Sequence, residues 1–103
     1  MNYKICVIGN EALLFPFLQF GFNAFSPETE EDLRECLKDV IEKNYGIIYL
    51  EDSYCFMVKD VIDKYKYSLT PIFIPIGGRR EGESYSEQQA REMMETAVGM
   101  NVL

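Results

Sequence analysis

Four short runs of mostly apolar residues predict the strands of a sheet. They are Tyr3–Ile8, Phe22–Phe25, Tyr45–Leu50 and Ile72–Ile76. The first and third runs are apolar at nearly every position, which is typical of strands buried on both faces of a parallel sheet. Because proline cannot donate a backbone hydrogen bond, Pro75 indicates that the fourth strand lies at an edge or ends there.

Segments with helical spacing separate these strands. Leu13–Phe20 predicts a short helix with Pro16 in its first turn, because proline deeper in a helix removes a hydrogen bond. A second helix is predicted from an N-cap at Ser26, with Pro27 as its first residue, to about Asn44. Its apolar stripe recurs at steps of three and four and comprises Leu33, Cys36, Leu37, Val40 and Ile41.

A third helix is predicted over about Tyr54–Tyr67, before the fourth strand. The alternation of strands and helices predicts an α/β fold of the Rossmann-like (receiver-like) type. In this fold, right-handed crossovers give a four-stranded parallel sheet flanked by helices. We predict a globular α/β domain over residues 1–76, a flexible tether over 77–84, and a C-terminal helix and tail over 85–103.

The predicted C-terminal helix has clear start and stop signals. Ser84 followed by Glu87 fits a capping box, and Gly99 stands where a left-handed residue would end the helix after Val98. A narrow apolar stripe on this helix comprises Ala90, Met93, Met94, Ala97 and Val98. Positions that recur at alternating steps of four and three, as on a helix lying along a coiled coil, are Ser86, Ala90, Met93, Ala97 and Met100.

Such a helix either folds back on its own sheet or binds another protein, and we expect the second. Methionine side chains suit a surface that repacks against a partner, although on most helices they belong to a core. The predicted partner-binding face consists of Ser86, Ala90, Met93, Met94, Ala97, Val98 and Met100.

Composition narrows the classes of partner. The chain has 103 residues, a hydrophobic fraction of 48% and a formal net charge of −7 at pH 7. Its length and apolar content suit one domain with a real core. Because the negative charge repels phosphate backbones and anionic lipids, we expect no nucleic-acid binding and no membrane insertion. The start of the sequence resembles no secretion signal, and no apolar run is long enough to span a bilayer.

The three cysteines, Cys6, Cys36 and Cys55, are odd in number and contain no Cys-x-x-Cys spacing. Each lies in or beside an apolar segment, so we predict buried free thiols and a reducing, cytoplasmic environment.

Residues that could bind a nucleotide or accept a phosphoryl group follow two of the predicted strands. Gly9 follows the first strand, but Gly-x-Gly-x-x-Gly is absent and Glu11 would repel a pyrophosphate, so a structural turn is the better interpretation. Glu51 and Asp52 follow the third strand, where a receiver domain carries its phosphoacceptor. The acidic pair expected after the first strand is only Asn10-Glu11, and the lysine expected after a fifth strand has no strand to follow, so phosphoryl chemistry lacks its electrostatic parts. A stand-alone receiver-like signalling domain is kept as the alternative function.

Other catalytic and cofactor sites find no support. The chain contains no histidine, which excludes Ser-His triads and the usual metal clusters. The loop Gly77–Arg80 lacks the Lys-Ser/Thr of a P-loop, and Glu81 and Glu83 balance its arginines, so we interpret it as a solvated tether. A dinucleotide-dependent oxidoreductase would need to retain a cofactor on purification. We predict no catalytic, cofactor-binding or metal-binding residues.

Five segments in this order resemble the F subunit of the V-type (archaeal and bacterial A/V-type) rotary ATPases over the whole chain. They are Tyr3–Gly9, Phe17–Phe22, Tyr45–Leu50, Leu69–Ile72 and Ala97–Leu103. Asn10 departs from the pattern, since many relatives carry aspartate after the glycine of the first strand. The position is not catalytic in that family, so the departure leaves the resemblance intact.

The resemblance implies a non-catalytic subunit of the central rotor stalk. In that family, the globular part docks on the D subunit, which is the coiled-coil shaft, and the C-terminal helix reaches towards the catalytic A/B hexamer. The assembly couples ATP hydrolysis or synthesis to H⁺ or Na⁺ transport. The resemblance also implies a cytoplasmic location, peripheral to the membrane, in the soluble V1/A1 sector.

Overall fold

The computed structural model describes residues 4–77 and 82–102, and their side chains as far as Glu95. Tyr3, Leu103 and positions 78–81 of the predicted tether lie outside the described residues. The elements in chain order are β1 (Lys4–Ile8), α1 (Glu11–Gln19), β2 (Asn23–Phe25), α2 (Glu30–Glu42), β3 (Tyr45–Glu51), α3 (Asp52–Met57), α4 (Lys59–Lys64), β4 (Ile72–Ile76) and α5 (Tyr85–Val102).

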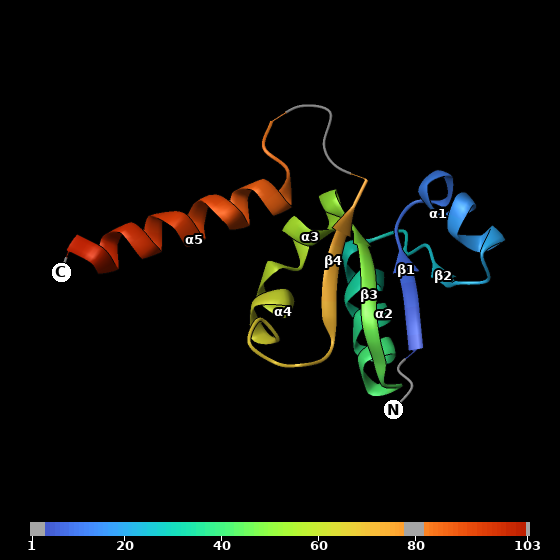
Figure 1. Cartoon of the computed structure of the whole chain (residues 1–103). Coiled ribbons are helices and arrows are strands. Elements are labelled where there is room, and N and C mark those ends of the chain that lie inside the picture. The colour runs from blue at the N-terminus through green and yellow to red at the C-terminus, as the bar shows by residue number, and fades with distance from the viewer. Residues whose placement is uncertain (1–3, 78–81, 103) are drawn as a thin grey trace.

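The four strands form one parallel sheet in the order β2-β1-β3-β4, as Figure 1 shows, which confirms the predicted fold class. Ile8 pairs with Phe25 on one side and with Leu50 on the other, so β1 and β3 are the inner strands. β4 pairs only with β3, and its Pro75 opposite Leu50 therefore lies on an edge strand, as predicted.

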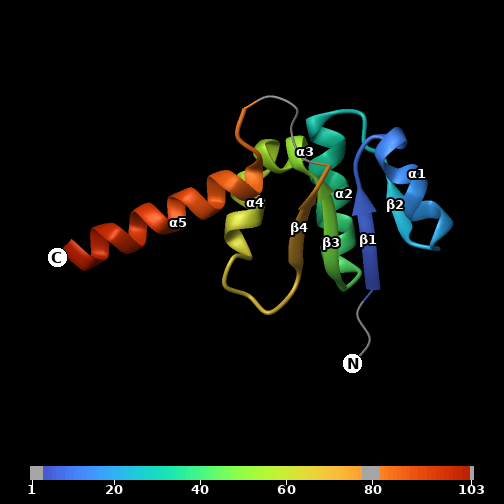
Figure 2. The same cartoon turned by 45° about the horizontal axis from the view of Figure 1, so that its top comes forward.

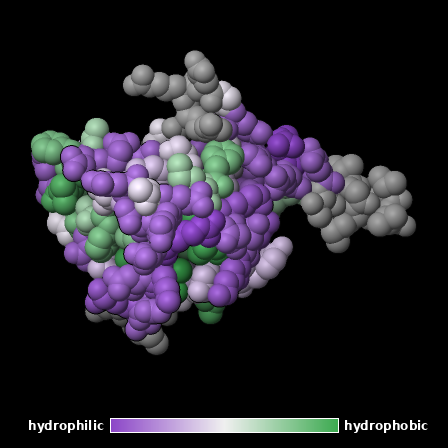
Figure 3. Space-filling model, turned by 180° about the vertical axis from the view of Figure 1, so that it is seen from behind, coloured by the Kyte–Doolittle hydropathy of each residue, from purple (hydrophilic) through white to green (hydrophobic). Residues whose placement is uncertain are grey.

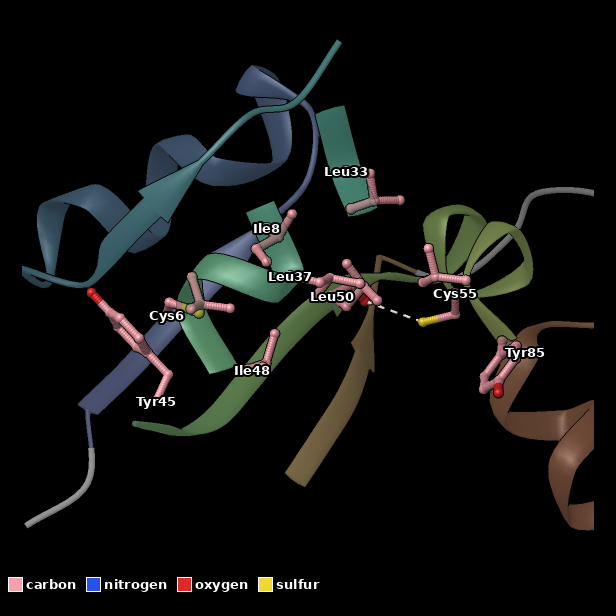
Figure 4. Close-up of a cluster of buried hydrophobic side chains, with 11 residues drawn as sticks. Cys6, Ile8, Leu33, Leu37, Tyr45, Ile48, Leu50, Cys55 and Tyr85 are labelled. Atoms are coloured by element: carbon pink, nitrogen blue, oxygen red, sulfur yellow. Dashed lines mark hydrogen bonds between the residues drawn. The ribbon is translucent and has the colours of Figure 1, made fainter. Parts of the chain in front are cut away.

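The larger core lies between the sheet and the helices α2 and α3. Alternate residues of β1 and β3, such as Ile8 and Ile48, pack there against the buried stripe of α2. Figure 4 shows this cluster, whose buried members are Cys6, Ile8, Leu33, Leu37, Val40, Tyr45, Ile48, Leu50, Cys55, Val58 and Tyr85. Tyr85 reaches this cluster from α5, although it comes after the fourth strand in the chain.

A smaller group of side chains lies outside this cluster, where α1 contacts β1 and β2. Val7 and Leu14 are buried, and the rings of Phe17, Phe22 and Tyr49 lie 5.9–6.2 Å apart between centroids. The two sides of the fold thus differ in size, and the helix bearing the predicted binding face joins the larger core.

Two predicted helix starts were wrong. α1 begins at Glu11 because the Asn10 side-chain oxygen accepts a hydrogen bond from the Leu13 N–H at 3.0 Å, so Pro16 is the sixth helical residue and not in the first turn. α2 begins at Glu30 and not after Ser26. Thr29 caps it by accepting from the Asp32 N–H at 3.0 Å, which places three acidic residues in the first turn beside the positive end of the helix dipole.

The single helix predicted over Tyr54–Tyr67 is in fact two short helices, α3 and α4, which meet at Val58. Val58 leaves the helical region of backbone angles, with φ −121° and ψ 32°. Arg34 of α2 donates to the Met57 carbonyl oxygen at 2.9 Å and forms an ion pair with Asp60 at 2.9 Å. These bonds satisfy a carbonyl group that a continuous helix would have paired internally.

The predicted stop at Gly99 was also wrong, because α5 is helical from Tyr85 to Val102. Glycine disfavours a helix by only about 1 kcal/mol relative to alanine, so it does not end a helix by itself. The predicted start is confirmed: the Ser84 hydroxyl oxygen accepts a hydrogen bond from the Glu87 N–H at 3.1 Å.

Candidate functional site

The first turn of α5 is fixed to the domain. Tyr85 is only 3% exposed, and its ring meets that of Phe56 edge-on at 5.3 Å between centroids. Cys55 lies beside them in the same buried cluster. A tyrosine ring buried to this extent is a core contact, so α5 leaves the domain from a rigid starting point.

Asp52 supplies the second attachment of α5. The Tyr85 N–H donates to both carboxylate oxygens of Asp52, at 3.0 and 2.9 Å. Asp52 is 2% exposed and starts α3, directly after β3. A carboxylate at a helix N-terminus satisfies an unpaired donor and interacts favourably with the helix dipole. Asp52 therefore fixes the first turn of α5 to the domain.

Two surface ion pairs lie within the C-terminal segment itself and do not join α5 to the sheet or to the other helices. The Arg91 guanidinium contacts Glu83 at 3.0 Å and Glu95 at 3.0 Å. These charges raise the pKa of Arg91, with the Glu83 hydrogen bond as the main cause. Because all three side chains are solvent-accessible, we expect this cluster to add little to stability.

Beyond its first turns, α5 projects away from the sheet, as Figures 1 and 2 both show. Met93 is 61% exposed and Met94 70% exposed, and Ser86 and Ala90 are also exposed. The structure therefore brings these four predicted binding residues onto a helix that leaves the domain. Ala97, Val98 and Met100 lie on the same helix, but their side chains are outside the described part.

The ends of β1 and β3 carry the residues considered for phosphoryl chemistry, and these residues bind one another. Glu51 Oε1 accepts hydrogen bonds from the backbone N–H of Asn10 at 2.9 Å and from its side-chain amide at 2.7 Å. The Ser53 hydroxyl donates to Glu51 Oε2 at 2.7 Å. A Cβ added at Gly9 would lie 3.0 Å from a Leu13 side-chain carbon and 3.1 Å from Glu51 Oε1, so these side chains would have to shift by a few tenths of an ångström to accommodate it.

This arrangement disfavours the receiver-like alternative. The crevice beyond the strand ends, where doubly wound folds bind ligands, is bridged here by the Asn10–Glu51 contact. Asp52 is turned inwards and bonded to α5, so it offers no exposed oxygen for phosphorylation. Among the described residues, no group of three or more histidine, cysteine, aspartate or glutamate side chains could hold a metal ion.

The cysteines are free thiols, as predicted. Cys6 and Cys55 are buried and Cys36 is half-buried. Burial raises the thiol pKa of Cys6 and of Cys55 to about 12, and that of Cys36 to about 11. Because the thiolate is the reactive form, these side chains act as core residues and not as nucleophiles.

The sequence analysis missed the attachment of α5. Tyr85 was not considered because it follows a glycine-rich, charged segment, and Asp52 was weighed only as a phosphoacceptor. A signal was present for Tyr85, since a large aromatic ring at the start of an otherwise polar helix turn favours contact with the preceding domain. No sequence pattern connects Asp52 to Tyr85, because they are 33 positions apart.

The surface on the side opposite to the view of Figure 1 is predominantly hydrophilic (Figure 3). Within residues 4–77 and 82–102, no helix combines the length and apolar character needed to cross a membrane.

Comparison with known proteins agrees with this architecture. A crystal structure of the F subunit of the V-type ATP synthase from Archaeoglobus fulgidus matches with a TM-score of 0.61 and 18% sequence identity. The match covers 75% of this chain and 100% of that chain. At this identity, the likeness supports the α/β fold.

Sequence relatives extend over the full length. The F subunits of the V-type ATP synthases from Clostridium perfringens and Fusobacterium nucleatum are each 23% identical over 103 residues, covering 100% of this chain and 98% of the relative. The corresponding protein of Clostridium botulinum strain Eklund 17B is 21% identical, with 100% of both chains covered. The family model of the ATP synthase (F/14-kDa) subunit matches residues 5–94. Since this match spans most of the chain, the protein belongs to the family of the ATP synthase (F/14-kDa) subunit, which includes the F subunits of V-type ATP synthases.

Proposed function

We propose that the chain is a non-catalytic central-stalk (rotor) subunit of a V-type rotary ATPase or ATP synthase. It docks on the coiled-coil shaft subunit and helps couple ATP hydrolysis or synthesis to H⁺ or Na⁺ transport. The observation that supports this proposal best is the projection of α5, which is anchored at Tyr85 and exposes Met93 and Met94. A helix that is fixed at one end and exposes Met93 and Met94 beyond it is suited to lie along another helix.

The proposed binding face combines small and adaptable side chains. The small side chains of Ser86 and Ala90 would let a partner helix approach closely. The flexible side chains of Met93 and Met94 would pack into gaps on the surface of that helix. By their spacing in the sequence, Ala97, Val98 and Met100 are predicted to extend this face. Burying one methionine side chain contributes about 1.5–3 kcal/mol before the cost of ordering is subtracted. Through this face, α5 contacts the shaft and reaches the catalytic A/B hexamer.

The absence of a catalytic role belongs to the same proposal. The strand ends that could carry chemistry are occupied by the bonds among Asn10, Glu51 and Ser53, and Asp52 serves α5. We therefore assign ATP turnover to other subunits. The acidic net charge suits a subunit in the cytoplasmic, membrane-peripheral sector of the complex.

The test is titration calorimetry of the full chain against the coiled-coil shaft subunit of the same complex. A second titration uses a chain without residues 93–103, which retains Tyr85 and the Arg91–Glu83 pair. We expect 1:1 binding by the full chain and a clear loss of affinity on truncation. No binding by the full chain would overturn the proposal and favour the receiver-like alternative.

A matched pair of variants isolates the exposed helix face. Met93→Asp places a new negative charge on the proposed interface, and we expect it to weaken binding at least tenfold. Lys38→Gln changes the net charge by the same amount on the exposed side of α2, and we expect it to leave binding nearly unchanged. Equal effects of both variants would show that overall charge, not the face of α5, controls the interaction.

A further inference from the structure

Helix α1 is apolar around its whole circumference. Of its nine residues, only the first and the last, Glu11 and Gln19, are polar. Leu14 is buried, whereas Phe15 is 63% exposed and Leu18 is 55% exposed. A helix that is apolar on all sides is normally buried on all sides. The outward side of α1 therefore has the composition of a contact surface.

The apolar surface continues to the C-terminal end of α1. Phe20, the residue that caps the helix, is 82% exposed, and Ala12 and Pro16 are exposed as well. These side chains form the α1 patch, which consists of Ala12, Phe15, Pro16, Leu18 and Phe20. Figures 1 and 2 show α1 and α5 at opposite ends of the molecule, and Figure 3 shows hydrophobic surface at the end away from α5. The α1 patch is thus separate from the exposed face of α5.

Charge favours a second copy of this chain as the occupant of the α1 patch. The chain has a formal net charge of −7, so two copies repel one another wherever their acidic surfaces meet. Helix α1 contributes a single charge, that of Glu11, and this residue stands at the end of the helix. Two copies that meet through α1 therefore bring no like charges together at the centre of the contact.

The exposed positions of α1 are also arranged symmetrically about Phe15. In a helix of 3.6 residues per turn, Glu11 and Gln19 lie about 40° to either side of Phe15. Ala12 and Leu18 lie about 60° to either side. If two α1 helices run antiparallel about a two-fold axis at Phe15, Ala12 of one copy is level with Leu18 of the other. The Glu11 carboxylate is then level with the Gln19 amide, which can donate to it. A two-fold contact requires self-complementarity of this kind.

The size of the α1 patch predicts a weak dimer. The exposed fractions of Phe15, Leu18 and Phe20 correspond to roughly 400 Å² of apolar surface on each copy. A stable protein interface buries about 800 Å² on each partner, so these three side chains supply about half of that area. We therefore expect a dissociation constant on the order of 100 µM.

We propose that two copies of this chain associate through the α1 patch, with their α1 helices antiparallel and Phe15 on the two-fold axis. The contact covers the apolar side of α1 that the domain leaves exposed. Because α1 and α5 lie at opposite ends of each copy, both α5 helices remain exposed in the dimer. Self-association is therefore compatible with the proposed function and does not depend on it.

The test is sedimentation equilibrium of the full chain over about 10–500 µM, a range that brackets the expected dissociation constant. Phe15→Asp places a negative charge of each copy on the axis, where the two charges meet, and we expect the dissociation constant to rise at least about tenfold. Tyr67→Asp is the matched control, because it makes the same kind of exchange at a residue that is 93% exposed in the loop before β4. We expect it to change the dissociation constant less than about twofold.

A cysteine at the two-fold axis tests the arrangement of the two helices. In Phe15→Cys, the two new thiols lie next to each other in the dimer, and a disulfide requires Cα atoms less than about 7 Å apart. We expect oxidation by dissolved oxygen to give a covalent dimer of Phe15→Cys on a non-reducing gel at least about ten times faster than of Tyr67→Cys. The natural chain is the second control, since its Cys6 and Cys55 are buried.

Three outcomes would overturn the proposal. The natural chain could stay monomeric up to about 500 µM, which would leave the α1 patch to a different partner. Phe15→Asp and Tyr67→Asp could change the dissociation constant equally, or Phe15→Cys could form a covalent dimer no faster than Tyr67→Cys. Because Phe15 is 63% exposed, Phe15→Asp should keep the fold, which an unchanged circular dichroism spectrum checks. None of these measurements contains the shaft subunit, so they are distinguishable from failure of the proposed function.

Discussion

The two ends of α5 differ in what surrounds them. At Tyr85 the helix is part of the core, with its ring against Phe56 and its N–H bonded to Asp52. Two turns later Met93 and Met94 face solvent. One helix therefore combines a contact that stabilises the domain with a surface that the domain does not use. A helix can therefore project from a domain in a fixed direction, because its first turn is packed in the core.

We expect the greatest loss of stability when the contact of Tyr85 with the core is removed. Tyr85→Ala removes a buried ring, and we expect the free energy of unfolding to fall by about 3–5 kcal/mol. Urea denaturation followed by circular dichroism measures this change. Tyr67→Ala is the matched control, since Tyr67 is 93% exposed and should change stability by less than about 0.5 kcal/mol. Similar values for the two variants would contradict the view that α5 starts inside the core.

The sequence predicts the domain better than it predicts the base of α5. Apolar runs predict strand positions such as Tyr45–Leu50, and the spacing of apolar residues predicts the buried stripe of α2. Both predictions succeed because the residues that form these patterns are the ones that are buried in the core. Thr29 shows a weaker signal, since Ser26 competes with it as a cap and only the packed helix decides between them. Contacts that join distant segments, such as Asp52 to Tyr85, leave no local pattern.

The features of the candidate site also differ in how far the sequence predicts them. The spacing of Ala90 and Met93 predicted a face that the structure leaves exposed, while its occupation by a partner stays a prediction. The break at Val58 was not predictable from the stripe of the third helix, because α3 and α4 both carry apolar residues at helical spacing. The Arg34 contact that stabilises the break comes from another helix.

A smaller effect is expected from the cap of α5. Asp52→Ala removes both acceptors of the Tyr85 N–H from a buried position, and we expect a loss of about 1–3 kcal/mol in the free energy of unfolding. Asp52→Asn retains one acceptor oxygen and should lose less. Hydrogen exchange of the Tyr85 amide should accelerate in the order natural chain, Asp52→Asn, Asp52→Ala. Unchanged exchange in Asp52→Ala would mean that the carboxylate does not hold the helix.

Substitutions at the projecting end of α5 should change the stability of the free chain least. Met94→Gln replaces an exposed apolar side chain with a polar one of similar helix propensity, so we expect the free energy of unfolding to change by less than about 0.5 kcal/mol. The same urea denaturation measures it. If α5 instead folds back on the sheet in solution, Met94 becomes buried and the substitution should cost about 1–3 kcal/mol. A loss of that size would remove the contrast between the two ends of the helix, because both would then belong to the packed domain.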